Sequence, residues 1–262
     1  MSYLSRVWLI TGTSSGLGRD LVRKAVDRGD RVIATARRLS RIEDLAAQYP
    51  NNVKVLQLDV TEPFKQIRSK AQEAVLLWNG IDVVVNNAGE ADALMETYKT
   101  NVFGAVNVTN TFLPYFREQR HGTIVFIGSR SGWRTNFVGN GFYGSSKAAL
   151  HAIADALAEE VKPFGIKVYN IMPSGIRTQG INNMRWVHGE TPSSQCSDSI
   201  KAISDYDEAI QSITTHFQST NSHETGDSQK VIVDLDISKK CHGVLDLLDQ
   251  WGDVAASTDL SE

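Results

Sequence analysis

Short apolar runs alternate with amphipathic helical stretches over roughly the first two thirds of this 262-residue chain. The apolar runs that predict buried strands are 7–10, 32–35, 53–58, 83–86, 123–127 and 167–171. The stretches between them that carry apolar side chains at helical spacing are 16–28, 41–49, 64–78, 91–119 and 143–164. Such strict alternation is typical of a parallel sheet with helices on both faces. We therefore expect a single α/β domain over residues 1–262, with a doubly wound parallel sheet of the Rossmann type.

The composition is that of an ordinary globular protein, with 41% hydrophobic and 22% charged residues and a net charge of −3. No basic field indicates nucleic acid as a partner. No apolar stretch approaches the ~20 residues of a membrane span, and no signal-peptide core precedes the first apolar run. Cys196 and Cys241 are far apart and lack a CxxC partner, which favours reduced thiols in a cytoplasmic protein. The six His residues form no pair at metal-ligand spacing, so we expect no metal.

The pattern weakens after Thr178. Residues 179–228 are rich in polar and loop-forming side chains, and we expect this region to include a substrate lid. Helical patterns return at 205–217, 229–236 and 243–256, but no convincing strand follows Asp236.

A glycine-rich turn joins the first expected strand to the first expected helix. Glycines permit a tight turn and let backbone N–H groups approach a pyrophosphate, while the helix N-terminus adds a favourable dipole. The residues expected to hold the phosphates of a dinucleotide are Gly12, Ser14, Ser15, Gly16, Leu17 and Gly18. The spacing is GxxxGxG rather than GxGxxG, and a plain glycine turn is the alternative for the motif alone.

Arg37 follows the second expected strand, where an acidic residue would accept hydrogen bonds from a ribose 2′-hydroxyl and select NAD. The chain carries no acid between that strand and Glu43. Because a guanidinium suits phosphate geometry, Arg37 favours a 2′-phosphate and therefore NADP(H). The alternative is that Arg37 and Arg38 are solvated surface charges.

Tyr143 and Lys147 are four residues apart, which places both side chains on one face of a helix. A free phenol has a pKa of about 10, too high for a base at neutral pH. A neighbouring ammonium favours the phenolate and would lower that pKa. The pair therefore indicates an acid/base couple.

Six elements, in order, are similar to those of the short-chain dehydrogenase/reductase family. The matching elements are Thr11-Gly12-xxx-Gly16-x-Gly18, Leu58-Asp59-Val60-Thr61, Asn86-Asn87-Ala88-Gly89, Asn101, Ser129 and Tyr143-xxx-Lys147. With their flanking strands they cover residues 7–178.

The resemblance implies contacts for the cofactor beyond the glycine turn. Asp59 and Val60 would contact the adenine, and Asn86 would brace the sheet. The residues that would pack on the cofactor or hold its carboxamide end are Asn87, Ala88, Gly89, Ile176 and Thr178.

The resemblance also implies catalytic roles. Tyr143 would be the general acid in reduction and the base in oxidation, and Lys147 would lower its pKa and hold the nicotinamide ribose. Ser129 would bond the substrate oxygen, with Ser131 as the rival candidate, and Asn101 would support a water-linked proton path. Taken alone, Ser129 is more often a strand-end turn serine, and Asn101 is more often a helix-interior residue that points to solvent.

These features predict an NADP(H)-dependent oxidoreductase that interconverts a ketone or aldehyde with an alcohol. The alternatives are a non-catalytic NADP-binding regulator and a dehydratase or epimerase on the same scaffold. A mostly aromatic set indicates a lipophilic or secondary-metabolite substrate, although its members could instead fill the core: Trp133, Phe137, Phe142, Trp186 and His188. The family's common dimers and tetramers imply a homo-oligomer. The stretch between Gly89 and Asn101 is shorter than the family pattern, and Pro173-Ser174 replaces its usual Pro-Gly.

Overall fold

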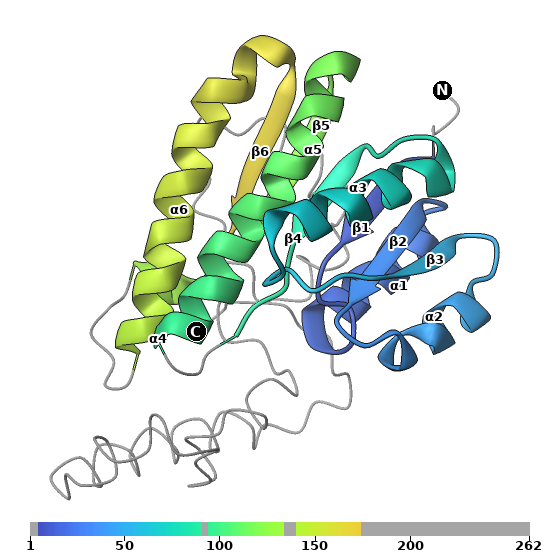
Figure 1. Ribbon diagram of the computed structural model, residues 1–262, viewed down its shortest axis with the longest axis horizontal. Helices are drawn as coiled ribbons and strands as arrows, with labels where there is room; N and C mark the ends of the chain where they lie inside the picture. The colour runs from blue at the N-terminus through green and yellow to red at the C-terminus, as the bar shows by residue number, and fades with distance from the viewer. Residues whose placement is uncertain (1–4, 91–93, 134–139, 174–262) are drawn as a thin grey trace, which may run out of the picture.

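The structure is a computed structural model that describes residues 5–90, 94–133 and 140–173. Its six strands are β1 (Val7–Ile10), β2 (Arg31–Ala36), β3 (Val53–Gln57), β4 (Val83–Asn86), β5 (Gly122–Ile127) and β6 (Ile166–Ile171). They form one parallel sheet in the order β3-β2-β1-β4-β5-β6 (Figure 1). Strand order reverses between β1 and β4, which places a topological switch point at the carboxyl ends of these two strands.

Helices cover both faces of the sheet (Figure 1). The helices on one face are α3 (Phe64–Trp78), α5 (Ala105–Gln119) and α6 (Gly141–Val161). Those on the other face are α1 (Gly16–Asp27) and α2 (Glu43–Gln48). The remaining short elements are α4 (Leu94–Tyr98), a π-helical segment η2 (Lys99–Gly104), and the 3₁₀ turns η1 (Leu39–Arg41), η3 (Arg130–Gly132) and η4 (Lys162–Phe164).

Two apolar cores sandwich the sheet, because successive strand residues point to opposite faces. Leu9 of β1 faces α3 and α5, whereas its neighbours Trp8 and Ile10 face α1. Phe112 and Phe116 of α5 fill the first core and are almost wholly buried. Burial of the strands on both faces explains why their sequences read as continuous apolar runs rather than alternating ones.

The doubly wound fold and its strands are confirmed, with 7–10 and 83–86 matching in full and the other four shifted by a residue or so. The long helix expected over 91–119, with an interruption or bend near Pro114, is divided earlier than that, because α4 and the π-helical η2 precede α5. Pro114 lies inside α5 and does not end it. The predictions for residues 174–262, including the lid within 179–228 and the missing last strand, lie outside the described residues. The assignment of all 262 residues to one domain stays a prediction.

Candidate functional site

The glycine turn has the backbone that its sequence predicts. Gly12 has φ +70° and Gly16 has φ +56°, the left-handed region that favours glycine. A Cβ on Gly12 would lie 2.8 Å from the Cα of Ala88, so no larger residue fits there without a shift of backbone. Ser15 precedes α1 without a side-chain cap, which leaves the first backbone N–H groups of the helix available to an anion. Ser14 and Leu17 lie half-buried in the same turn.

Thr11 and Asn87 tie the ends of β1 and β4 together at the switch point. The Thr11 hydroxyl accepts hydrogen bonds from the backbone N–H groups of Asn87 and Ala88, both at 3.0 Å. The Asn87 amide donates to the carbonyl oxygens of Thr11 at 2.8 Å and Gly12 at 3.1 Å. Gly18 packs so closely on Gly12 that a Cβ there would lie 2.5 Å from the Gly12 carbonyl oxygen. Asn87 therefore shapes the glycine turn, a role that the sequence did not reveal.

Asn86 braces the sheet as the family resemblance implies. Its side-chain nitrogen donates a 3.0 Å hydrogen bond to the hydroxyl of Thr109 on α5, and its side-chain oxygen is buried without a partner. Gly89 is exposed beyond this strand end, and a Cβ there would lie 3.8 Å from the Lys147 ammonium nitrogen. The strand end that carries Ala88 and Gly89 thus borders both the glycine turn and α6, the helix that carries Lys147.

Arg37 and Arg38 are both exposed at the end of β2. The Gln57 amide donates a 3.0 Å hydrogen bond to the Arg37 carbonyl oxygen, which holds this strand end beside β3. Asp59 accepts hydrogen bonds from the backbone N–H of Thr61 at 2.9 Å and from its hydroxyl at 2.7 Å. The carboxylate of Asp59 is therefore engaged in the turn after β3, and Val60 is buried against Gly104.

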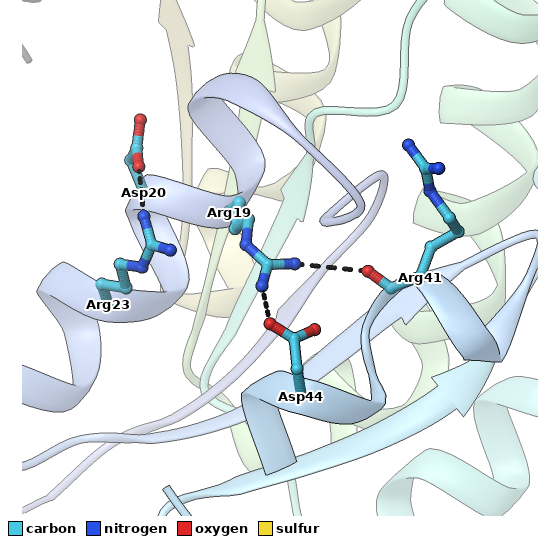
Figure 2. Close-up of polar contacts among 5 residues, drawn as sticks. All are labelled: Arg19, Asp20, Arg23, Arg41 and Asp44. Atoms are coloured by element: carbon cyan, nitrogen blue, oxygen red, sulfur yellow. Dashed lines mark hydrogen bonds and ion pairs between the residues drawn. The ribbon is translucent and has the colours of Figure 1, made fainter. Parts of the chain in front are cut away.

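Arg19 connects α1 to the segment that follows β2. Figure 2 shows its guanidinium reaching from α1 to the carboxylate of Asp44 and to the carbonyl oxygen of Arg41, the latter at 3.2 Å. The neighbouring pair of Arg23 and Asp20 stays within α1 at 3.2 Å. Arg19 therefore fixes η1 and the start of α2 relative to the glycine turn.

Ser129, Tyr143 and Lys147 converge at the carboxyl end of β5. Ser129 follows that strand, whereas Tyr143 and Lys147 lie one turn apart on α6. Burial raises the pKa of Tyr143, and a hydrogen bond with Ser129 partly opposes the rise. The Lys147 ammonium lies 5.7 Å from the centroid of the Tyr143 ring. We expected Lys147 to lower the pKa of Tyr143, but burial is the larger cause and the shift is upward.

The pKa of Lys147 is strongly shifted as well. Its side chain is buried, its ammonium donates a 2.8 Å hydrogen bond to the Ile127 carbonyl oxygen, and burial lowers its pKa to about 8. The rival Ser131 lies farther along the loop, and its backbone N–H donates to the Ser129 hydroxyl at 3.1 Å. Ser129 is thus the serine that the structure places beside Tyr143.

Asn101 lies in the π-helical η2 and is buried rather than solvent-facing. The side-chain oxygen of Asn101 accepts a 2.7 Å hydrogen bond from the backbone N–H of Glu90. Its side-chain nitrogen donates to the backbone carbonyl oxygen of Glu90 at 2.8 Å. The amide also donates to the Ser146 hydroxyl at 3.0 Å. Asn101 therefore fixes the chain after Gly89 against α6, next to Lys147.

His151 is a site residue that sequence reasoning missed. It lies one turn beyond Lys147 on α6, is buried, and contacts both Ser129 and Trp133. The four-residue spacing that links Tyr143 to Lys147 also links Lys147 to His151, and this repeated spacing was the available signal.

Five expected site or pocket residues lie outside the described residues. They are Ile176, Thr178, Phe137, Trp186 and His188. Among the described residues, no group of His, Cys, Asp and Glu could hold a metal ion. No helix within those same ranges has the length and apolar character needed to cross a membrane.

Comparisons with known proteins agree with this geometry. The family model for short chain dehydrogenase matches residues 6–186. Oxidoreductase BOA17 of Botryotinia fuckeliana is 35% identical over 186 residues, which are 67% of this chain and 67% of that protein. The NADPH-dependent 1-acyldihydroxyacetone phosphate reductase of Saccharomyces cerevisiae is 34% identical over 185 residues, 66% of this chain and 62% of that protein.

A solved structure agrees as well. A short-chain dehydrogenase from Streptomyces avermitilis superposes with a TM-score of 0.70 at 34% identity, covering 87% of this chain and 81% of that one. The family model covers more than half of the chain, and the glycine turn and the Tyr143–Lys147 helix both lie inside the matched segment. The chain therefore belongs to the short-chain dehydrogenase family of oxidoreductases.

Proposed function

We propose that this protein is an NADP(H)-dependent oxidoreductase that interconverts a ketone or aldehyde with the corresponding alcohol. The observation that carries the proposal is the convergence of Ser129 and Tyr143, which share a hydrogen bond, with the buried Lys147. A serine hydroxyl and a phenol that meet at one point can both donate to a single carbonyl oxygen.

The chemistry follows from the charge that develops on that oxygen. When bound, the nicotinamide cofactor supplies the hydride in reduction and accepts it in oxidation. Ser129 and Tyr143 stabilise the negative charge where it forms, and Tyr143 delivers the proton. The raised pKa of Tyr143 keeps the phenol protonated near neutral pH, which suits the acid role in reduction. Below its pKa of about 8, Lys147 adds a positive charge to the site.

The residues present fit a dinucleotide phosphate. The turn at Gly12 leaves no room for a Cβ, and the uncapped start of α1 offers backbone N–H donors. The residues that would hold the cofactor here are Gly12, Ser14, Ser15, Gly16, Leu17, Gly18, Asp59, Val60, Asn87, Ala88 and Gly89. Ile176 and Thr178 stay predictions for its carboxamide end. The exposed Arg37 supports NADP(H), as does the NADPH dependence in the name of the yeast relative.

Two exposed aromatic side chains support a lipophilic substrate. Trp133 is 64% exposed and follows the Ser129 turn, and Phe142 is 44% exposed and precedes Tyr143. Each lies within four residues of a proposed catalytic group and offers apolar area to a substrate. The expected homo-oligomer and cytoplasmic location stay predictions.

Replacing the proposed proton donor tests the function. Tyr143→Phe removes only the hydroxyl, so it should abolish nearly all NADPH-dependent reduction across a panel of ketones and aldehydes while NADPH still binds. Tyr115→Phe is the matched control, because Tyr115 lies on α5 and packs on Phe112. Unchanged turnover by Tyr143→Phe would contradict the mechanism.

The same assays separate the alternatives. NADPH binding without turnover of any carbonyl would indicate a regulator. Product formation without transfer of the labelled hydride from NADPH would indicate a dehydratase or epimerase.

The cofactor preference needs its own test. Arg37→Asp replaces a phosphate-binding charge with a 2′-hydroxyl acceptor, so preference should shift from NADPH towards NADH. Arg68→Asp, at an exposed position of α3, makes the same charge change elsewhere and is the control. A wild-type preference for NADH would show the Arg37 argument to be wrong.

A further inference from the structure

His151 lies beneath the loop of residues 128–133, which carries Ser129 and Trp133. The loop approaches the imidazole at two glycines. A Cβ on Gly128 would lie 2.5 Å from Nε2 of His151, and one on Gly132 would lie 2.8 Å from its Cε1. Glycine at both positions therefore lets the loop close on the ring, and His151 is almost wholly buried as a result.

Two N–H donors face the imidazole. The Trp133 indole nitrogen donates to Nδ1 of His151 at 2.6 Å, and the Ser129 backbone nitrogen lies 3.3 Å from Nε2. A neutral imidazole has one bare nitrogen and can accept only one of these two N–H groups; an indole N–H can only donate, so the shorter contact, from Trp133, requires that nitrogen to be Nδ1. The side-chain amide oxygen of Asn170 is buried without a partner, and it borders Gly128 as Nε2 does.

The surroundings of His151 keep the ring neutral. Burial and then the charge of Lys147 lower its pKa, and Asp155 opposes the shift. Both charged groups lie on α6 itself. The groups that face the ring from the loop and from β6 are neutral: Gly128, Ser129, Gly132, Trp133 and Asn170. A neutral ring retains the lone pair that accepts the Trp133 N–H.

We propose that His151 is a positioning residue that holds the 128–133 loop on the catalytic helix, so that Trp133 forms a fixed aromatic wall for the apolar part of a carbonyl substrate. The inference rests on the proposed function, because it takes Ser129 and Tyr143 as the groups that act on the carbonyl. Trp133 keeps 64% of its surface exposed although its N–H is fixed, so the ring can offer a face to a ligand at little cost in side-chain entropy. His151 thereby holds the wall by a hydrogen bond, and it packs at Gly128 and Gly132 against the loop that carries Ser129.

Nuclear magnetic resonance of the indole N–H groups tests the contact itself. The chain has five Trp, and the signal that disappears in Trp133→Phe belongs to Trp133. In the wild type this signal should lie downfield, as expected for a short hydrogen bond, and should move once the pH falls below the lowered pKa of His151 and the ring gains a proton. His151→Leu should return it to the position of an exposed indole, and His151→Gln, which keeps an acceptor, should restore part of the shift. His121→Leu, at an exposed histidine, is the control. A Trp133 signal that ignores His151→Leu would overturn the proposal.

Kinetics with two ketones tests the wall. His151→Leu should reduce kcat/KM for 2-acetylnaphthalene by roughly 10- to 100-fold, as expected when reacting groups lose their positions. The loss for butan-2-one, which is too small to cover an indole face, should be several-fold smaller, and Trp133→Ala should show the same selectivity. Equal losses for the two ketones would overturn the aromatic wall.

The two measurements separate the two hypotheses. If the wild type reduces no carbonyl compound, the proposed function fails and the substrate contact fails with it. The indole signal would still decide whether His151 holds Trp133. If the wild type reduces ketones but the signal does not depend on His151, the proposed function stands and the positioning role is wrong.

Discussion

The ammonium nitrogen of Lys147 donates a 2.8 Å hydrogen bond to the carbonyl oxygen of Ile127, the last residue of β5. The bond joins α6 to the strand end from which Ser129 projects. The same burial that shields it from water lowers the pKa of Lys147 to about 8. Lys147 therefore joins α6 to the end of β5, and its side chain changes charge near pH 8.

The lowered pKa of Lys147 predicts a pH-dependent stability. The unfolded chain binds the lysine proton up to the ordinary value of 10.5, but the folded chain releases it near 8, so stability rises with pH between these values. Between about pH 7.5 and about pH 9.5 the wild type should gain about 2 kcal/mol in unfolding free energy relative to Lys147→Met. Urea unfolding at both pH values measures the difference. Lys65→Met, at an exposed position of α3, is the control, and a difference that does not change with pH would contradict the prediction.

The glycine turn predicts a contrast between two glycines of similar conformation. Gly12 and Gly29 both have positive φ, +70° and +86°, but only Gly12 has backbone within reach of an added Cβ. Gly29→Ala should cost about 1 kcal/mol for the left-handed conformation alone, whereas Gly12→Ala should cost about 2–4 kcal/mol because it also displaces Ala88. Urea unfolding gives both costs, and titration with NADPH should show weaker binding for Gly12→Ala only. Equal costs would mean that the turn tolerates the extra methyl group.

The contacts of Arg19 predict that its replacement weakens NADPH binding more than replacement of Arg23 does. Arg19→Met loses contacts to Asp44 and to the Arg41 carbonyl, which lie 25 and 22 residues away in sequence, whereas Arg23→Met loses only a local pair (Figure 2). Exposed ion pairs contribute little, so both variants should lose no more than about 1 kcal/mol. Because Arg19 fixes the segment that follows Arg37, its loss should raise the Kd for NADPH several-fold, and that of Arg23 should not. Isothermal titration measures both Kd values, and equal values would show that the Arg19 contacts do not serve the cofactor end.

The strands were predictable because they are buried on both faces. Each then reads as an unbroken apolar run, and the runs stop where the carboxyl ends turn polar, as at Asn86 and Ser129. The glycine turn was predictable because few residues other than glycine adopt the positive φ of Gly12 and Gly16. Both signals are local in sequence.

The features that escaped prediction depend on contacts between distant segments. The π-helical η2 has no periodicity of its own, and it places Asn101 against Glu90 and Ser146. The amide of Asn87 donates hydrogen bonds to Thr11 and Gly12 across the sheet, and nothing in the local sequence around Asn87 indicates these partners. The upward pKa shift of Tyr143 follows from tertiary burial, which the spacing to Lys147 does not report.

The pH profile of reduction should distinguish the roles of Lys147 and Tyr143. The pKa of Tyr143 is raised above its ordinary 10, so the phenol stays protonated through the neutral and mildly alkaline range. The ammonium of Lys147 is lost as pH rises through about 8, so kcat/KM for ketone reduction should fall there if that charge supports the reaction. Lys147→Arg keeps a positive charge at all accessible pH values, so whatever activity it retains should no longer decline near pH 8. Circular dichroism of both proteins over the same range excludes unfolding as the cause. If kcat/KM of Lys147→Arg still declines near pH 8, the decline belongs to another group. The charge of Lys147 then does not support the reaction.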